Sequence, residues 1–499
     1  MEYIKGPKWN SFDCRKIKGE DHLGIKNTAI IISDYLQTGI TSITPRARYW
    51  SFYTWVLYDF IENHTERTMV NFKRFLKKQE WFYILANIGE AEKRGTKIIS
   101  LIGTDKGKSN WTNSIGVVDG CLDYVKNPLG GYGTAYRNVL KILGLTRAAD
   151  NEKGVKIDRL TDKGKELAKA FEDTIKNTDY YINWRNKEEA VPKDVLTEYG
   201  QAAGLDRLNQ DSKDLPIIKE LFLQKDSKNE LSQLRYESMM YYKFIIDTED
   251  KKNLNFLKTW RTLMYDVYSV RGRTKKNVPK QFEIVSKGWE IYQGRQMFTY
   301  SLEAIWAHLL EHLSRKQYSY KTLVDKVLEN LKGAGIDTDV LVKDFIENLS
   351  LKVDEREAYI ERINSDVINV IENVYNPFKI MLEVYNRFLE RDDLNEMHKD
   401  FLSMGNRAHI SLKFWEKTID EHKNKSIKYL IQYIMRYFIL EQHQLVALNK
   451  LVSTNNETYH FVENDRNLEF IANDQPTFNV FRVYEGVSIL KDLGCLSKS

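Results

Sequence analysis

The sequence predicts a mainly α protein of several domains, with a short β-hairpin near its C-terminus. Its 499 residues exceed what one ordinary hydrophobic core holds, so about two to four domains are expected. The chain has only eight prolines, and none lies within 280–376 or 378–475, which leaves room for long uninterrupted helices. Apolar residues recur at helical spacing in blocks such as 301–313 and 427–452.

The net charge, the cysteines and the lack of long apolar stretches exclude several classes of protein. The chain carries 75 Lys and Arg against 70 Asp and Glu, and this net charge of +5 is too slight to identify a nucleic-acid partner by itself. Its three cysteines, Cys14, Cys121 and Cys495, lie far apart and form no disulfide framework or zinc motif. No stretch approaches the roughly 18 apolar residues that a membrane span needs. We therefore expect a soluble, cytoplasmic protein without a membrane segment.

Changes in composition along the chain suggest five segments. Glycine and asparagine punctuate the second segment, polar residues dominate the third, and helical periodicity returns in the fourth. The last contains an alternating stretch around an Asn-Asp turn, which is typical of a hairpin. The segments are an N-terminal helical domain (1–103), a mixed domain (104–175), a connector (176–230), a helical body (231–452), and a β-hairpin with a C-terminal helix (453–499).

An aromatic helix is expected from Thr44 to Phe60. Thr44 can cap the first turn and Pro45 fits the first helical position. Seven aromatic residues make this helix apolar nearly all round, so it should be buried and not stack exposed bases. Arg46 and Arg48 lie in the first turn, where the helix dipole disfavours cations, so a negative group should lie beside them. That group is either a carboxylate of this chain, in a structural ion pair, or a bound anion.

Residues 130–171 show a specific order of elements. A helix spans about Thr134 to Leu143 and stops at Gly144. Two short strands follow, near 145–147 and 155–160, with a polar tip between them. Thr161 then caps a second amphipathic helix.

This order, together with Gly144-Leu145-x-Arg147 before the tip and Leu160-Thr161-x-Lys163-Gly164 after it, resembles the winged-helix domain of bacterial regulators over about residues 108–172. The resemblance implies that the first helix enters the DNA major groove while the wing touches the backbone. The residues so placed are Tyr132, Thr134, Tyr136, Arg137 and Lys141 on DNA, and Arg147, Lys153 and Lys156 on phosphates. The tip also holds Asp150 and Glu152, so a protein-docking role is the alternative.

A basic loop is expected at 269–282. No acidic residue interrupts it between Asp266 and Glu283, and Gly272 and Pro279 mark it as a connection between helices. Its cations are Arg271, Arg273, Lys275, Lys276 and Lys280. They either bind nucleic-acid phosphates or form a solvated surface.

The segment AHLLEH contains His308, Glu311 and His312 and resembles the H-x-x-E-H motif of pitrilysin-type metallopeptidases. The resemblance implies that both histidines bind zinc, that Glu311 is the base, and that Glu383 or Glu390 is the third ligand. However, the motif lies inside a continuous helix without flanking strands. We therefore expect a surface-facing trio and neither a bound metal nor a cofactor.

No nucleotide-binding loop, nucleophile elbow or defensible nuclease pattern occurs in the chain. Five further histidines are scattered and are expected to be structural or exposed: His398, His409, His422, His443 and His460. We therefore favour a non-enzymatic nucleic-acid-binding or scaffold subunit of a prokaryotic multi-protein assembly.

The expected partners of this subunit are nucleic acid, with DNA favoured over RNA, and other protein subunits. Residues 38–60 also resemble, weakly, uncharacterised bacterial proteins from anti-phage defence loci, which implies a defence role. Two alternatives stay open. One is a hydrolase, either a nuclease or the zinc metallopeptidase above, and the other is a protein-only adaptor of an ATPase complex.

Overall fold

A computed structural model describes most of the chain. The described residues are 21–98, 100–149, 157–225, 228–249, 257–266, 278–363, 369–389, 391–405 and 410–497. Within them the chain forms twenty α-helices and three two-stranded antiparallel sheets. The mainly α class and the hairpin near the C-terminus are therefore confirmed. None of the described helices is both long and apolar enough to span a membrane.

The chain divides into two compact units, and each combines segments from distant parts of the sequence. Unit 1 contains Met1–Ser33 and Glu249–Asn479, and unit 2 contains Asp34–Thr248 and Val480–Ser499. Helix α1 (Asn27–Leu36) contains the first boundary. Of the five segments expected from the sequence, the mixed domain and the connector belong wholly to unit 2, whereas most of the helical body belongs to unit 1.

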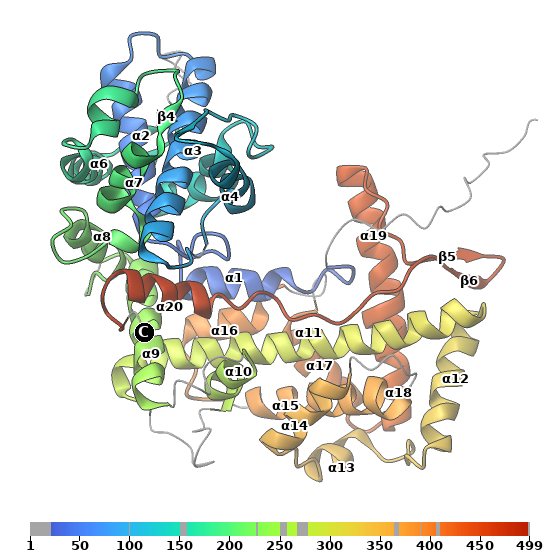
Figure 1. Cartoon of the computed structure of the whole chain (residues 1–499). Helices are drawn as coiled ribbons and strands as arrows, with labels where there is room; N and C mark the ends of the chain where they lie inside the picture. The colour runs from blue at the N-terminus through green and yellow to red at the C-terminus, as the bar shows by residue number, and fades with distance from the viewer. Residues whose placement is uncertain are drawn as a thin grey trace, which may run out of the picture. The chain divides into compact units, whose positions relative to one another are not determined.

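Unit 2 is built around α2 and α3, which lie side by side, with α6 packed on α2 and α7 packed on α3 (Figure 1). Helix α2 is buried along most of its length, as its seven aromatic residues predict. The helices are α2 (Arg48–Asn63), α3 (Met69–Arg94), α4 (Thr104–Asn113), α5 (Arg137–Ile142), α6 (Asp162–Ile175), α7 (Lys193–Ala203), α8 (Leu215–Phe222), α9 (Glu230–Thr248) and α20 (Val483–Asp492). The strands are β1 (Val117–Val118), β2 (Thr146–Arg147), β3 (Arg159–Leu160) and β4 (Val191–Pro192).

The order of elements expected from the sequence for residues 134–171 is present in unit 2. A π-helical turn (Tyr132–Tyr136) continues into α5, and Gly144 then adopts the left-handed conformation, with φ of 70°. Strands β2 and β3 pair antiparallel. The Thr161 side chain accepts the N–H of Gly164 at the start of α6, as the sequence predicts. Residues 150–156 of the tip lie outside the described part of the chain.

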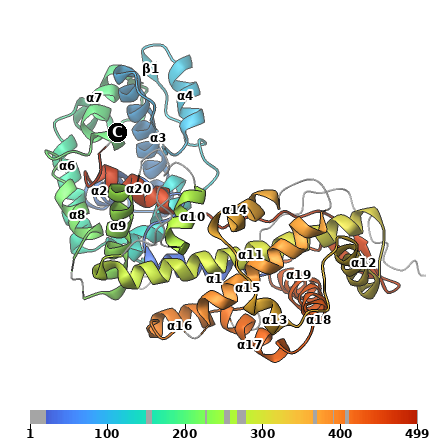
Figure 2. The same ribbon diagram turned by 90° about the horizontal axis from the view of Figure 1, so that it is seen from below.

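Unit 1 is organised along the long helix α11, and α15 lies beside it (Figure 2). Its helices are α10 (Leu257–Asp266), α11 (Glu283–Arg315), α12 (Tyr320–Gly333), α13 (Val342–Glu347), α14 (Val353–Arg362), α15 (Asn376–Phe388), α16 (Glu396–Ser403), α17 (Leu412–His422), α18 (Ile427–Tyr433) and α19 (Glu441–Thr454). Strands β5 (Phe461–Asn464) and β6 (Asn467–Phe470) form the C-terminal hairpin. Its two-residue turn, Asp465-Arg466, has positive φ at both positions, as a type I′ turn requires.

Candidate functional site

Both tyrosines expected to face DNA, Tyr132 and Tyr136, are buried. The Tyr136 ring packs 4.9 Å, centroid to centroid, from each of the Tyr49 and Tyr53 rings of α2. The Tyr132 hydroxyl donates to a carboxylate oxygen of Asp158 at 2.7 Å. Both side chains belong to the core of unit 2. This placement corrects the expectation that they face DNA.

The two cations of α5, Arg137 and Lys141, share one carboxylate of the same chain, Asp158. Arg137 Nε lies 2.5 Å from one oxygen of Asp158, and Lys141 Nζ lies 3.3 Å from the other. Although burial opposes ionisation of Asp158, hydrogen bonds from Arg137 and Tyr132 lower its pKa below the ordinary value. Arg147 on β2 differs, because it is exposed and forms no ion pair with a described residue. Lys153 and Lys156 lie outside the described residues.

The basic loop is described only at its end. Lys280 is exposed at the start of a 3₁₀ turn, Lys280–Phe282. Arg271, Arg273, Lys275 and Lys276 lie outside the described residues, so their role stays a prediction.

Arg46 and Arg48 both contact carboxylates of the same chain. Arg46 Nε lies 3.0 Å from Asp492, and its Nη2 lies 2.6 Å from Asp206. Arg48 Nε lies 3.4 Å from Asp214, and neither side chain of this pair is exposed. These contacts agree with a structural ion pair between each arginine and a carboxylate of this chain, which was one of the two interpretations of Arg46 and Arg48; the other was a bound anion.

The H-x-x-E-H motif is also placed differently from its expected position. His308 and His312 are buried, with ring centroids 4.8 Å apart, and Glu311 pairs with Arg315. The expectation of a surface-facing trio is therefore wrong for both histidines. Helix α11 is buried around most of its circumference, including the edge of its apolar stripe.

Nothing described completes a zinc site around this histidine pair. Among the described residues, His308 and His312 belong to no group of three or more His, Cys, Asp or Glu side chains close enough to share a metal ion. Glu383 accepts hydrogen bonds from Tyr265 and Arg387 instead. Glu390 lies outside the described residues.

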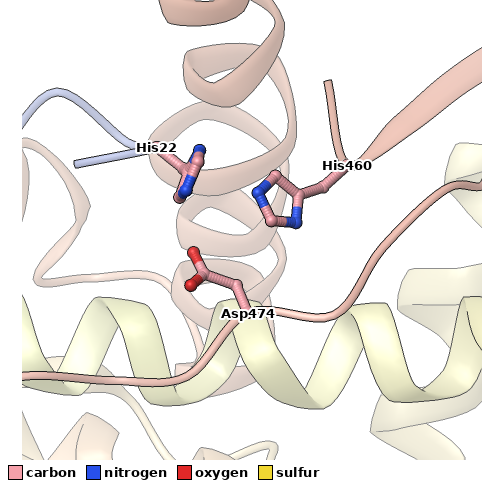
Figure 3. A group of neighbouring side chains, drawn as sticks. All are labelled: His22, His460 and Asp474. Atoms are coloured by element: carbon pink, nitrogen blue, oxygen red, sulfur yellow. The ribbon is translucent and has the colours of Figure 1, made fainter. Parts of the chain in front are cut away.

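A different cluster lies in unit 1, formed by His22, His460 and Asp474 (Figure 3). His22 lies in the turn before α1, His460 directly precedes β5, and Asp474 follows β6. One ligand atom from each residue lies within 4.8 Å of the other two. Both histidines are buried and Asp474 is half-buried. The fold thus brings together three side chains from opposite ends of the sequence.

Neighbouring groups contact the backbone of His22 and the side chains of His460 and Asp474. His443 of α19 directs Nδ1 at the carbonyl oxygen of His22, at 3.1 Å, and Nε2 accepts the N–H of His460 at 3.0 Å. His460 Nδ1 lies 3.0 Å from the Ala472 carbonyl oxygen. Trp306 Nε1 donates to Asp474 Oδ2 at 3.1 Å. Burial is the largest cause that lowers the pKa of His22, to about 4, and it also lowers the pKa of His460.

The sequence did not indicate this cluster. His443 and His460 were expected to be structural or exposed, and no ligand spacing connects His22 with Asp474. Only the tertiary fold brings the residues together.

Comparisons with family models, with curated proteins and with solved structures find no match for this chain.

Proposed function

We propose that the protein is a cytoplasmic nucleic-acid-binding subunit of a prokaryotic multi-protein assembly. In this proposal the wing-like hairpin of unit 2 contacts phosphates, and base edges are not read. The observation that supports it best is the difference between Arg147, exposed without a described ion pair, and Arg137, neutralised by Asp158. A place in anti-phage defence rests on the resemblance of residues 38–60 alone.

The chemistry of the hairpin favours contact with the phosphate backbone of DNA. Phosphate binding needs cations that are accessible and not already neutralised, because the gain comes from released counterions. Base reading needs side chains on a helix that can enter the major groove, and here Tyr132 and Tyr136 are buried. DNA is favoured over RNA because the order of elements resembles a winged helix.

The test is the salt dependence of binding to a labelled DNA duplex, measured by fluorescence anisotropy. Arg147→Gln should weaken binding about equally for all sequences and reduce the slope of log affinity against log salt by roughly 0.9. The matched variant Arg137→Gln should leave that slope unchanged, because Asp158 already neutralises Arg137. Circular dichroism first confirms that each variant folds.

The reverse result, with the slope reduced by Arg137→Gln and not by Arg147→Gln, would show that α5 and not the wing meets DNA. The basic loop is tested in the same way by changing Arg271, Arg273, Lys275 and Lys276 together to Gln. If the wild type shows no salt-dependent binding to duplex DNA, single-stranded DNA or RNA at low ionic strength, the proposal fails. The hairpin would then be a protein-docking element.

A further inference from the structure

We propose that His22, His460 and Asp474 of unit 1 bind one divalent transition-metal ion of the Zn²⁺ or Fe²⁺ type. This inference is independent of the nucleic-acid proposal, since it concerns other residues in the other unit.

At least one ring nitrogen of each histidine has no hydrogen bond. The Ala472 carbonyl can only accept, so His460 Nδ1 carries the proton and Nε2 keeps its lone pair. His460 Nε2 is buried without a hydrogen-bond partner, and so is Nδ1 of His22. Buried polar atoms without partners are uncommon, because each has lost its bonds to water. Two of them beside one half-buried carboxylate point to a missing shared partner.

A cation fits this position better than a proton does. No hydrogen bond among the described residues joins the Asp474 carboxylate to either ring. The unprotonated His460 Nε2 and the Asp474 carboxylate then lie close together with no proton between them, which is unfavourable in a poorly solvated place. A divalent ion between the three groups converts this repulsion into coordination.

The spacing suits such an ion after a small closure. The three ligand atoms lie within 4.8 Å of one another. Bonds of about 2.0–2.2 Å to zinc place tetrahedral ligands roughly 3.4 Å apart, so shifts of about 1 Å at the side-chain ends suffice. Figure 3 shows the Asp474 carboxylate turned towards the two rings.

Neighbouring groups contact the side chains of His460 and Asp474, as is usual for metal ligands, and the backbone of His22. His443 contacts the backbone of both histidine ligands, through the His22 carbonyl and the His460 N–H. Trp306 Nε1 fixes one oxygen of Asp474, and the N–H of Gln475 donates to the other at 2.9 Å. Three distant segments are thus locked around one point.

The ligand set selects the class of ion. Imidazole nitrogens suit Zn²⁺ and Fe²⁺, whereas Mg²⁺ and Ca²⁺ prefer oxygen ligands only. Three protein ligands leave at least one coordination position for water or another small ligand, unlike a closed four-ligand structural zinc site.

The test measures bound metal in the full-length chain after removal of any histidine tag. The protein is stripped with a chelator, dialysed against Zn²⁺ or, without oxygen, against Fe²⁺, and analysed by elemental mass spectrometry. We expect about one ion per chain. Asp474→Asn keeps an acceptor for Trp306 but should lower the affinity for Zn²⁺ by at least about 100-fold, and Trp306→Phe should lower it by about 10- to 100-fold.

His308→Gln with His312→Gln is the matched control and should keep one ion per chain, because these residues lie outside the cluster. Zn²⁺ should raise the thermal midpoint of the wild type and not that of Asp474→Asn, which also shows whether the variant is folded. The proposal is overturned if the wild type binds neither Zn²⁺ nor Fe²⁺. It is equally overturned if folded Asp474→Asn and His460→Gln both retain full affinity.

Discussion

Arg46, next to the start of α2, forms a buried ion pair with Asp492, the last residue of α20. Asp492 Oδ2 accepts from Arg46 Nε at 3.0 Å and from the N–H of Ala47 at 2.9 Å. The carboxylate therefore lies at the N-terminus of α2, where the helix dipole favours an anion. This explains how an arginine is tolerated directly before the N-terminus of an aromatic helix.

The first prediction concerns this pair. Asp492→Ala should lower the free energy of unfolding by about 3–5 kcal/mol, because the buried Arg46 guanidinium loses its Asp492 ion pair and keeps only Asp206 as a carboxylate partner. Urea denaturation of Asp492→Ala, Arg46→Ala and the double variant measures the coupling. A coupling energy near zero would show that the two side chains do not support each other.

The second prediction concerns Arg48, which donates to the Gly204 carbonyl oxygen at 3.0 Å and faces Asp214. Arg48→Ala should destabilise by about 3–5 kcal/mol, because Asp214 would be left charged in the core. The paired change Arg48→Met with Asp214→Leu should recover most of that loss, since no buried charge remains. A thermal midpoint unchanged in Arg48→Ala would instead mean that the arginine is solvated.

The third prediction concerns the contact between α3 and α7. A Cβ added at Gly200 would lie 2.1 Å from the Ala86 carbonyl oxygen, so Gly200→Ala must push the helices apart. We expect the free energy of unfolding of Gly200→Ala to fall by about 1–3 kcal/mol. The control is Gly333→Ala in α12, where a Cβ meets nothing within 4 Å and the change should stabilise by up to about 1 kcal/mol. Equal effects of the two changes on urea midpoints would contradict the close packing.

Local features of this fold could be predicted from the sequence. The Thr161 cap, the left-handed Gly144 and the C-terminal hairpin depend on a few neighbouring residues. The carboxylate partners of Arg46 and Arg48 could not be predicted, because they come from α20 and from the region between α7 and α8.

The candidate sites show the same contrast between features that depend on neighbouring residues and contacts that depend on the tertiary fold. Tyr136 was expected to face DNA because the winged-helix resemblance placed it there, and the local sequence cannot show that α2 covers it. The cluster of His22, His460 and Asp474 has no spacing signature, because each residue comes from a separate segment. Local sequence therefore predicted the elements, and tertiary contacts decided which side chains are accessible.

The fourth prediction concerns Glu80, a buried carboxylate that accepts the N–H groups of Gly131 and Tyr132 at 2.9 and 2.8 Å. Burial raises the pKa of Glu80 to about 7. The folded state then keeps its proton to higher pH than the unfolded state, so the contribution of Glu80 to stability falls as pH rises from about 4.5 to 7.

Glu80→Gln cannot ionise, so its stability relative to the wild type should rise by up to about 3 kcal/mol over that pH range. Exposed Glu62 supplies the matched control variant, Glu62→Gln. The measurement is urea denaturation at several pH values. Parallel pH profiles for Glu80→Gln and the wild type would contradict the prediction.

The last prediction concerns His308, whose two ring nitrogens are buried without hydrogen-bond partners. Burial is the largest cause that lowers the pKa of His308, to about 3. The unfolded state then takes up its proton first, so the contribution of His308 to stability is present above about pH 6.5 and is lost as pH falls towards 3.

His308→Leu removes this titration and the two unsatisfied nitrogens. The His308→Leu protein should be at least as stable as the wild type at pH 7.5. At pH 5 its free energy of unfolding relative to the wild type should be about 2 kcal/mol higher than at pH 7.5. Alanine at His308 and His312, by contrast, should destabilise at both pH values because it leaves a cavity. Urea denaturation at the two pH values checks each variant. A His308→Leu protein that is less stable than the wild type by the same amount at pH 7.5 and 5 would show that the imidazole has a partner in the folded chain.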